Sequence, residues 1–152
     1  MASWADFEKA EPEFAERVRR LFDSGRHKTM ATLRKDGSPR ISGIEVEFGD
    51  GEMILGVMPM SVKGADLRRD SRLALHSPSP DPPKGSPSDW TGDAKIRGRA
   101  VELSEPVRPE PVAGWFRVDL QEVVVTSVGR PADHLVIESW HPDRGLRRQQ
   151  RA

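Results

Sequence analysis

Short runs of alternating apolar and polar residues, separated by turn signals, recur along most of this chain. Ile44, Val46 and Phe48 alternate with Glu45 and Glu47, as expected for a half-buried strand, because neighbouring side chains of a strand point to opposite faces. Asp-Gly and Gly-Asp-Gly sequences between such runs are typical of hairpin turns. Hairpins join antiparallel neighbours, so the pattern predicts an antiparallel barrel or sandwich and argues against a parallel sheet whose strands are linked by helices.

Seven strands and two helical regions are expected. The strands lie on either side of a turn at 36–37 within residues 27–48, and then at 52–58, 71–77, 93–103, 116–128 and 133–140. A helix is expected within the N-terminal region 1–25, at residues 11–24, where the apolar residues recur with helical spacing. A second, short helix follows Ser61. The proline-rich segment 78–92 is expected to be a loop and residues 105–111 a break. Composition alone predicts that residues 144–152, in the basic tail, form a frayed, unpaired terminus.

Length and composition exclude several classes of protein. The 152 residues predict one domain covering 1–152. The 24 basic residues balance 24 acidic ones, so the chain lacks the net positive charge that non-specific nucleic-acid binding requires. Without cysteine the chain has no disulfide and no thiolate metal site, and its four histidines lack metal-ligand spacing. No apolar run has the length of a membrane span, and the acidic N-terminus is unlike a signal peptide. A cytoplasmic protein without a metal is therefore expected.

The sequence Ser61-Val62-Lys63-Gly64 is the strongest candidate for a binding site. If Ser61 caps a helix, the free N–H groups of the first turn and the helix dipole favour an anion there, and Lys63 adds a full charge. Gly64 is expected to let the anion approach the backbone closely. The alternative is a capped surface helix with a solvated lysine, and these four residues alone do not decide between the two.

Taken together, the segments resemble the pyridoxamine 5'-phosphate oxidase-like family of flavin-binding split barrels. The segment TMATLRKDGSPRIS is similar to the family's opening hairpin, and GEMILGVMPMSVKGADLRRDSRLAL to its strand, Ser-x-Lys-Gly and short helix. DAKIRGRAVEL and LVIESW with a distal arginine resemble later parts, so that the likeness covers roughly residues 26–148. It implies a mainly β fold, an antiparallel six-stranded split barrel with short flanking helices, in a homodimer that holds FMN, or the deazaflavin F420, in the subunit seam.

The resemblance also assigns residues to that cofactor. Ser61, Val62, Lys63 and Gly64 are implied at the phosphate, and Gly56 and Val57 in the strand that flanks the ring. Met30, Thr32 and Leu33 are implied in the strand that faces the other edge of the ring. The pair that the second subunit contributes is implied as Trp140 and Arg151, or Trp140 and Arg148 if the register is shifted.

Two departures from the family pattern bear on function. Family oxidases often have Arg-Lys at the phosphate, whereas this chain has Val62-Lys63, so one charge is missing and Arg40 or Arg68 is a candidate to replace it. The segment that closes over a pyridoxal ring is not recognisable, which argues against a vitamin B6 substrate.

The resemblance implies an FMN-dependent oxidoreductase that transfers hydride to or from a small organic substrate. An F420-dependent reductase stays open, since the arginines at 68, 69 and 72 offer charge for an acidic cofactor tail. A non-catalytic flavin or haem carrier or sensor, and a purely structural barrel dimer, are the remaining alternatives. In the first two cases the chemistry resides in the cofactor, which agrees with the lack of a recognisable acid–base pair in the sequence.

Overall fold

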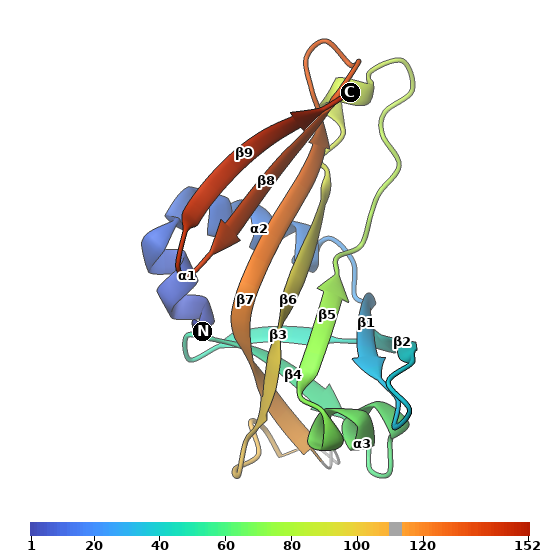
Figure 1. Ribbon diagram of the computed structural model, residues 1–152, viewed down its shortest axis with the longest axis vertical. Coiled ribbons are helices and arrows are strands. Elements are labelled where there is room, and N and C mark those ends of the chain that lie inside the picture. Colours follow the sequence, from blue (N-terminus) through green and yellow to red (C-terminus); the bar gives the residue numbers. More distant parts are fainter. Residues whose placement is uncertain (110–113) are drawn as a thin grey trace.

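The computed structural model describes residues 1–109 and 114–152, so the predicted break at 105–111 lies partly outside the described residues. Within these two ranges, nine strands join in one antiparallel sheet, which is strongly curved, with three α-helices around it (Figure 1). The mainly β, antiparallel split barrel with short helices that the family resemblance implied is confirmed. None of the helices in these two ranges is both long and apolar enough to cross a membrane.

The helices and strands alternate irregularly along the chain. The helices are α1 (Trp4–Ala10), α2 (Pro12–Asp23), α3 (Val62–Arg69) and the 3-10 helix η1 (Pro87–Asp89) within the proline-rich loop. The strands are β1 (Lys28–Leu33), β2 (Pro39–Ile44), β3 (Val46–Gly49), β4 (Glu52–Val57), β5 (Arg72–His76), β6 (Asp93–Glu102), β7 (Gly114–Val128), β8 (Leu135–His141) and β9 (Gly145–Arg151).

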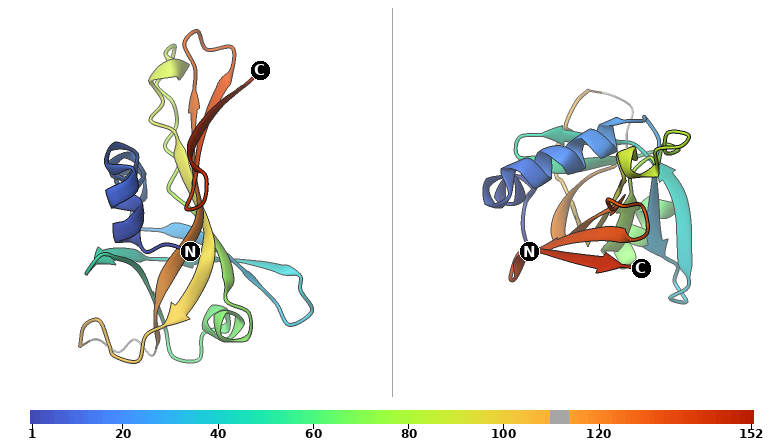
Figure 2. Two further views of the ribbon diagram at one scale, coloured as in Figure 1. Left: turned by 60° about the vertical axis from the view of Figure 1, so that its left-hand side comes forward. Right: turned by 90° about the horizontal axis from the view of Figure 1, so that it is seen from above.

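Strand β7 connects the two halves of the molecule. The strand order is β2-β1-β5-β6-β7-β4-β3, and β8 pairs with both β7 and β9. The first residues of β7 pair with β4, whereas its last six pair with β8. The lower half therefore holds the barrel strands and α3, while the upper half is a hairpin extension that α1 and α2 cover from one side (Figures 1 and 2).

The N-terminal region contains two helices where the sequence predicted one. Helix α2 agrees with the expected helix at 11–24, but α1 was missed. Ser3 and Asp6 form a reciprocal capping box that begins α1, and Pro12 at the start of α2 separates the two helices. A seven-residue helix has too few turns for a periodic pattern to emerge, so only its cap signalled it.

Two strand predictions also need correction. The tail is not an unpaired terminus, because β9 pairs along its whole length with β8, from Leu135–Arg151 to His141–Gly145. The expected second strand of residues 27–48 is split at Glu45, since Ile44 pairs with β1 whereas Val46 pairs with β4. The side chains of β9 are almost all exposed, and for that reason the tail shows no apolar alternation in sequence.

Candidate functional site

Ser61 begins helix α3 as a cap. Its hydroxyl oxygen accepts a hydrogen bond from the Gly64 N–H at 3.1 Å, and its carbonyl accepts one from the Ala65 N–H at 3.2 Å. The preceding Met60 has a left-handed backbone, with φ of 62°, which turns the chain from β4 into the helix. Within the described residues no group accepts a hydrogen bond from the N–H of Val62 or Lys63. Two first-turn donors therefore remain open to a ligand.

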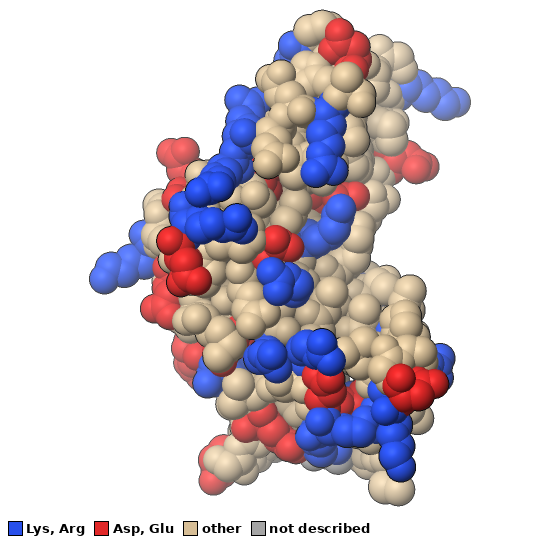
Figure 3. Space-filling view, in the orientation of Figure 1, with Lys and Arg blue, Asp and Glu red and all other residues tan. Residues whose placement is uncertain are grey.

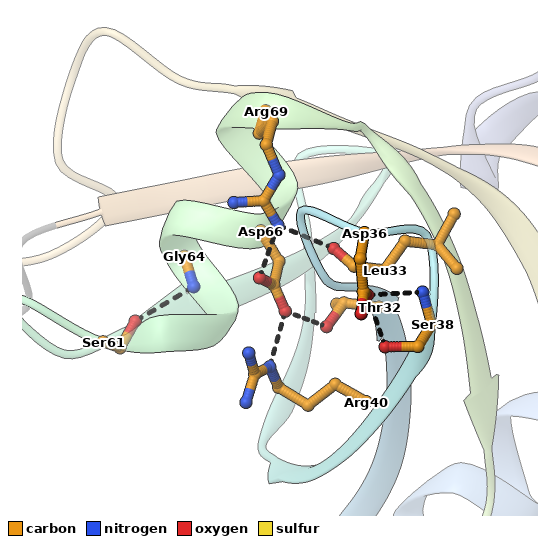
Figure 4. A network of polar contacts seen from close by, with 9 residues as sticks. All are labelled: Thr32, Leu33, Asp36, Ser38, Arg40, Ser61, Gly64, Asp66 and Arg69. Atoms are coloured by element: carbon orange, nitrogen blue, oxygen red, sulfur yellow. Dashed lines mark hydrogen bonds and ion pairs between the residues drawn. The ribbon is translucent and has the colours of Figure 1, made fainter.

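Helix α3 lies along β2 in the antiparallel sense. Lys63 in its first turn donates from Nζ to the Gly43 carbonyl at 2.5 Å, and one turn later Asp66 accepts from Nε of Arg40 at 2.7 Å. The two contacts fix the helix on the strand, so that the N-terminus of α3 lies over the end of β2 that precedes β3. Residues 40–43 and 61–66, which are distant in sequence, are brought together (Figure 4).

A buried carboxylate that the sequence did not reveal organises this contact. Asp66 is only 1% exposed, and Thr32, Arg40 and Arg69 donate to it at 2.7–2.8 Å (Figure 4). Burial raises the pKa of Asp66, but the hydrogen bonds from these three side chains outweigh it and lower the pKa to about 2. Asp66 is therefore a carboxylate at neutral pH. The spacing from Asp66 to Arg69 was the only local signal, and a solvated helix face has the same spacing.

A hollow of about 320 Å³ beside α3 brings three of the predicted residues together. Its walls include Gly56, Val57 and Lys63, together with Gly43 and Trp115. A Cβ at Gly56 would lie 3.0 Å from the Trp115 ring, so the glycine lets that ring pack against β4. Sequence reasoning missed Trp115, because it precedes the expected strand at 116–128 and contacts β4 only through the fold.

Other predicted residues lie in less accessible positions. Met30 and Val57 are buried in the core, at 0% and 1% exposed, so neither residue offers appreciable surface to a ligand. A Cβ at Gly64 would lie 2.8 Å from the Ser61 hydroxyl oxygen and 3.1 Å from Val57. The glycine therefore makes room for the helix cap inside the protein, rather than for an approaching anion as the sequence suggested.

Thr32 and Leu33 were expected to face the cofactor ring, but in the structure they form hydrogen bonds with residues of α3. Thr32 bonds to Asp66, and the Leu33 carbonyl accepts from Arg69 at 2.8 Å. Both residues also line a second hollow between β1, β5 and β6. They hold α3 in place, and Thr32 is too buried, at 2% exposed, to offer its side chain to a ligand.

Trp140 occupies a position different from the one that the sequence suggested. Its indole is 3% exposed and packs on Phe7 of α1, with ring centroids 4.7 Å apart. The helix that covers Trp140 is α1, which the sequence did not predict. Its side chain is thus part of the core of its own chain and is not available at a subunit seam.

The C-terminal arginines lie in the upper half, away from α3 (Figure 1). Arg148 lines a hollow with Arg17 and Glu138, whereas Arg151 lines another with Lys95 and Glu122. They face opposite sides of β9, because strand side chains alternate. Neither joins Lys63 within one chain, so any contact with the same ligand requires a second copy.

The structure distinguishes between the two arginines proposed to replace the missing charge. Arg68 is paired with Glu102 at 2.9 Å and lies over the Phe116 ring, whereas Arg40 reaches the α3–β2 contact.

Figure 3 shows basic side chains over β9 and again around α3. Within residues 1–109 and 114–152, no three His, Asp or Glu side chains are placed to hold a metal ion.

No family model and no curated protein sequence matches the chain. Solved structures do. PhzG from Burkholderia lata 383, in complex with tetrahydrophenazine-1-carboxylic acid, is 14% identical with a TM-score of 0.66, covering 99% of this chain and 96% of that one. A pyridoxamine 5'-phosphate oxidase-related, FMN-binding protein from Nostoc punctiforme is 10% identical with a TM-score of 0.62, covering 100% and 98%. A pyridoxinephosphate oxidase family protein from Clostridium acetobutylicum is 12% identical with a TM-score of 0.62, covering 88% and 97%.

Proposed function

We propose that this chain, which has the split-barrel fold of pyridoxamine 5'-phosphate oxidase-related proteins, binds FMN beside α3 and acts as a flavin-dependent oxidoreductase on a small organic substrate. The observation that carries the proposal is the first turn of α3. There the open N–H groups of Val62 and Lys63 lie beside two cationic side chains, Lys63 and Arg40. Such an arrangement suits a phosphate, which combines negative charge with several acceptor oxygens.

The start of α3 has more hydrogen-bond donors than a capped surface helix needs, and their number suits a phosphomonoester. The Ser61 hydroxyl bonds to Gly64 and still has hydrogen-bonding capacity, and Lys63 has two ammonium protons beyond the one given to Gly43. The adjacent hollow, with Gly56 and Trp115 in its walls, is the proposed place of the ring. Bound flavin supplies hydride transfer, while these residues bind the phosphate and orient the ring.

The charges around α3 support FMN rather than F420. An acidic F420 tail needs unpaired cations, but Arg68, Arg69 and Arg72 each pair with a carboxylate at 2.7–2.9 Å. Their partners are Glu102, Asp66 and Asp70, so each of these three arginines already has a carboxylate partner. Asp66 is shared with Arg40, whose terminal nitrogens donate to no acceptor in the described residues. Lys63 and Arg40, the cations proposed for the ligand, lie together near the first turn of α3, as expected for one phosphate group.

The proposed assembly is a homodimer with the flavin in its seam. Four large apolar side chains on β2 and around the start of α3 are 56–98% exposed: Ile41, Met58, Met60 and Val62. Apolar side chains gathered beside a site are typical of surfaces that a partner covers. A second copy would also close the hollow beside Trp115. In that arrangement Arg148 or Arg151 of the second copy is the candidate to reach the ring.

Spectroscopy of the purified protein tests the proposal. We expect added FMN to bind with a changed absorbance band near 450 nm (roughly, for oxidised flavin) and quenched fluorescence, whereas F420 binds more weakly. The loaded protein is expected to be a dimer by light scattering at micromolar concentration, and to turn over with NAD(P)H as hydride donor. Binding without turnover would indicate a carrier, and tighter binding of F420 than of FMN would overturn the choice of cofactor.

A further inference from the structure

Arg40 pairs with the buried Asp66 through one nitrogen, Nε. Its Nε donates to the carboxylate at 2.7 Å, and no acceptor in the described part of the chain bonds to its terminal nitrogens, Nη1 and Nη2. A guanidinium frequently meets a carboxylate with two nitrogens in parallel. Here one nitrogen anchors the side chain, and the two-nitrogen fork that matches a phosphate is left open.

The open nitrogens are directed toward the start of α3. In Figure 4 the guanidinium of Arg40 extends beneath the helix, with Nε next to Asp66 and the terminal nitrogens on the side where Ser61 and Gly64 lie. Asp66 is one turn from Lys63, and one helical turn rises about 5.4 Å, so the fork is within reach of an anion at the first turn. The side chain is 24% exposed, which leaves it accessible to a ligand.

Asp66 itself is held too firmly to follow a moving arginine. Thr32 donates to the same oxygen as Arg40, and Arg69 donates to the other oxygen and also to the Leu33 carbonyl. The carboxylate is thereby fixed to β1 and to its own helix. A long side chain anchored on such a group loses little rotamer freedom when a ligand binds, which improves affinity.

We propose that Asp66 is a positioning residue: it holds Arg40 by Nε so that Nη1 and Nη2 face the phosphate bound at the first turn of α3. The proposal rests on the proposed function, because it concerns the same anion. It also accounts for the charge that is missing next to Lys63, where the chain has the exposed apolar side chain of Val62. The second cation comes from Arg40 of β2, and the buried Asp66 orients it.

Affinities for FMN and riboflavin, measured by fluorescence titration, test this role, because riboflavin has the same ring and lacks the phosphate. We expect Asp66→Asn to lower the preference for FMN over riboflavin by roughly tenfold, the scale of one charge-assisted hydrogen bond. Asp70→Asn is the matched control. It removes a carboxylate at the end of the same helix that pairs with Arg72 and does not contact Arg40, so the preference is expected to be unchanged.

Arg40→Lys gives a second, independent result if Asp66→Asn folds poorly. Lysine keeps the charge, but its single ammonium lacks separate nitrogens in a fixed fork for Asp66 and the phosphate, so the preference is again expected to fall. In an Arg40→Met background Asp66→Asn is expected to have no further effect on the preference, because Asp66 acts through Arg40.

The outcomes separate this inference from the proposed function. A wild-type protein that binds FMN no better than riboflavin overturns both, since no phosphate site exists. A wild-type preference that survives Asp66→Asn and Arg40→Lys overturns only the positioning role. The role is also overturned if Asp66→Asn reduces the preference as much in the Arg40→Met background as alone, because the effect then bypasses Arg40.

Discussion

Replacing Trp140 by alanine is expected to lower the free energy of unfolding by about 3–5 kcal/mol, the range for removing a large aromatic side chain from a core. The indole is 3% exposed and lies against Phe7, which in turn contacts Trp4 and Phe14. The change would leave a cavity between β8 and α1. Chemical denaturation monitored by far-UV circular dichroism measures the difference.

Leu146 provides the control for Trp140. It lies directly opposite Trp140 in the β8–β9 pairing but is 37% exposed, so Leu146→Ala is expected to cost about 1 kcal/mol or less. If Trp140→Ala instead leaves stability unchanged and only weakens dimerisation or flavin binding, then the indole acts at a seam and its packing on Phe7 is not what matters.

Replacing Asp66 by alanine is expected to cost about 3–5 kcal/mol at pH 7, because Arg40 and Arg69 lose the carboxylate that compensates them. The loss depends on pH. The pKa of Asp66 is lowered to about 2, from 3.8, so its ionised form stabilises the folded state above pH 4. That contribution, about 2 kcal/mol from the pKa difference, disappears as the pH falls from 4 to 2.

Unfolding curves of wild type and Asp66→Ala at pH 7, 4, 3 and 2 measure this dependence, and the gap between them is expected to narrow below pH 4. Asp70→Asn is a suitable control. Asp70 also has a pKa lowered to about 2, by hydrogen bonds from Arg72, but it lies at the surface, so a much smaller effect is expected. A gap that stays constant down to pH 2 would contradict the ionised state of Asp66.

The residue pattern was sufficient for an antiparallel β fold because the strands repeat a local pattern, and the family resemblance singled out the split barrel. Alternating side chains and Asp-Gly turns located β1 and β4 to β8, and placed β2 and β3 in one continuous strand. The Ser61 cap was recognisable because capping depends on neighbouring residues. Strand β9 was missed because its two faces are both exposed, so pairing with β8 holds it without any apolar alternation. Helix α1 was missed because it is too short to show a period.

The parts of the site that escaped prediction depend on contacts between distant segments. Asp66 is a functional candidate only because β1 supplies Thr32 and β2 supplies Arg40, and no local pattern encodes that meeting. Trp115 reaches the hollow through its pairing with Gly56, 59 positions earlier in the chain. The position of Trp140 depended in turn on α1, so one missed helix led to the wrong surroundings for that side chain.

Titration of Lys63→Ala with FMN tests the central claim, that a phosphate binds at the first turn of α3. The substitution is expected to weaken binding by about 1.5–3 kcal/mol, the scale of a charge-assisted hydrogen bond, and Ser61→Ala by about 1 kcal/mol, as loss of a cap and a hydroxyl contact. Lys84→Ala, in the exposed proline-rich loop, is expected to bind FMN like the wild type. If Lys63→Ala also binds both FMN and F420 with wild-type affinity, α3 is an ordinary capped helix and the flavin site lies elsewhere.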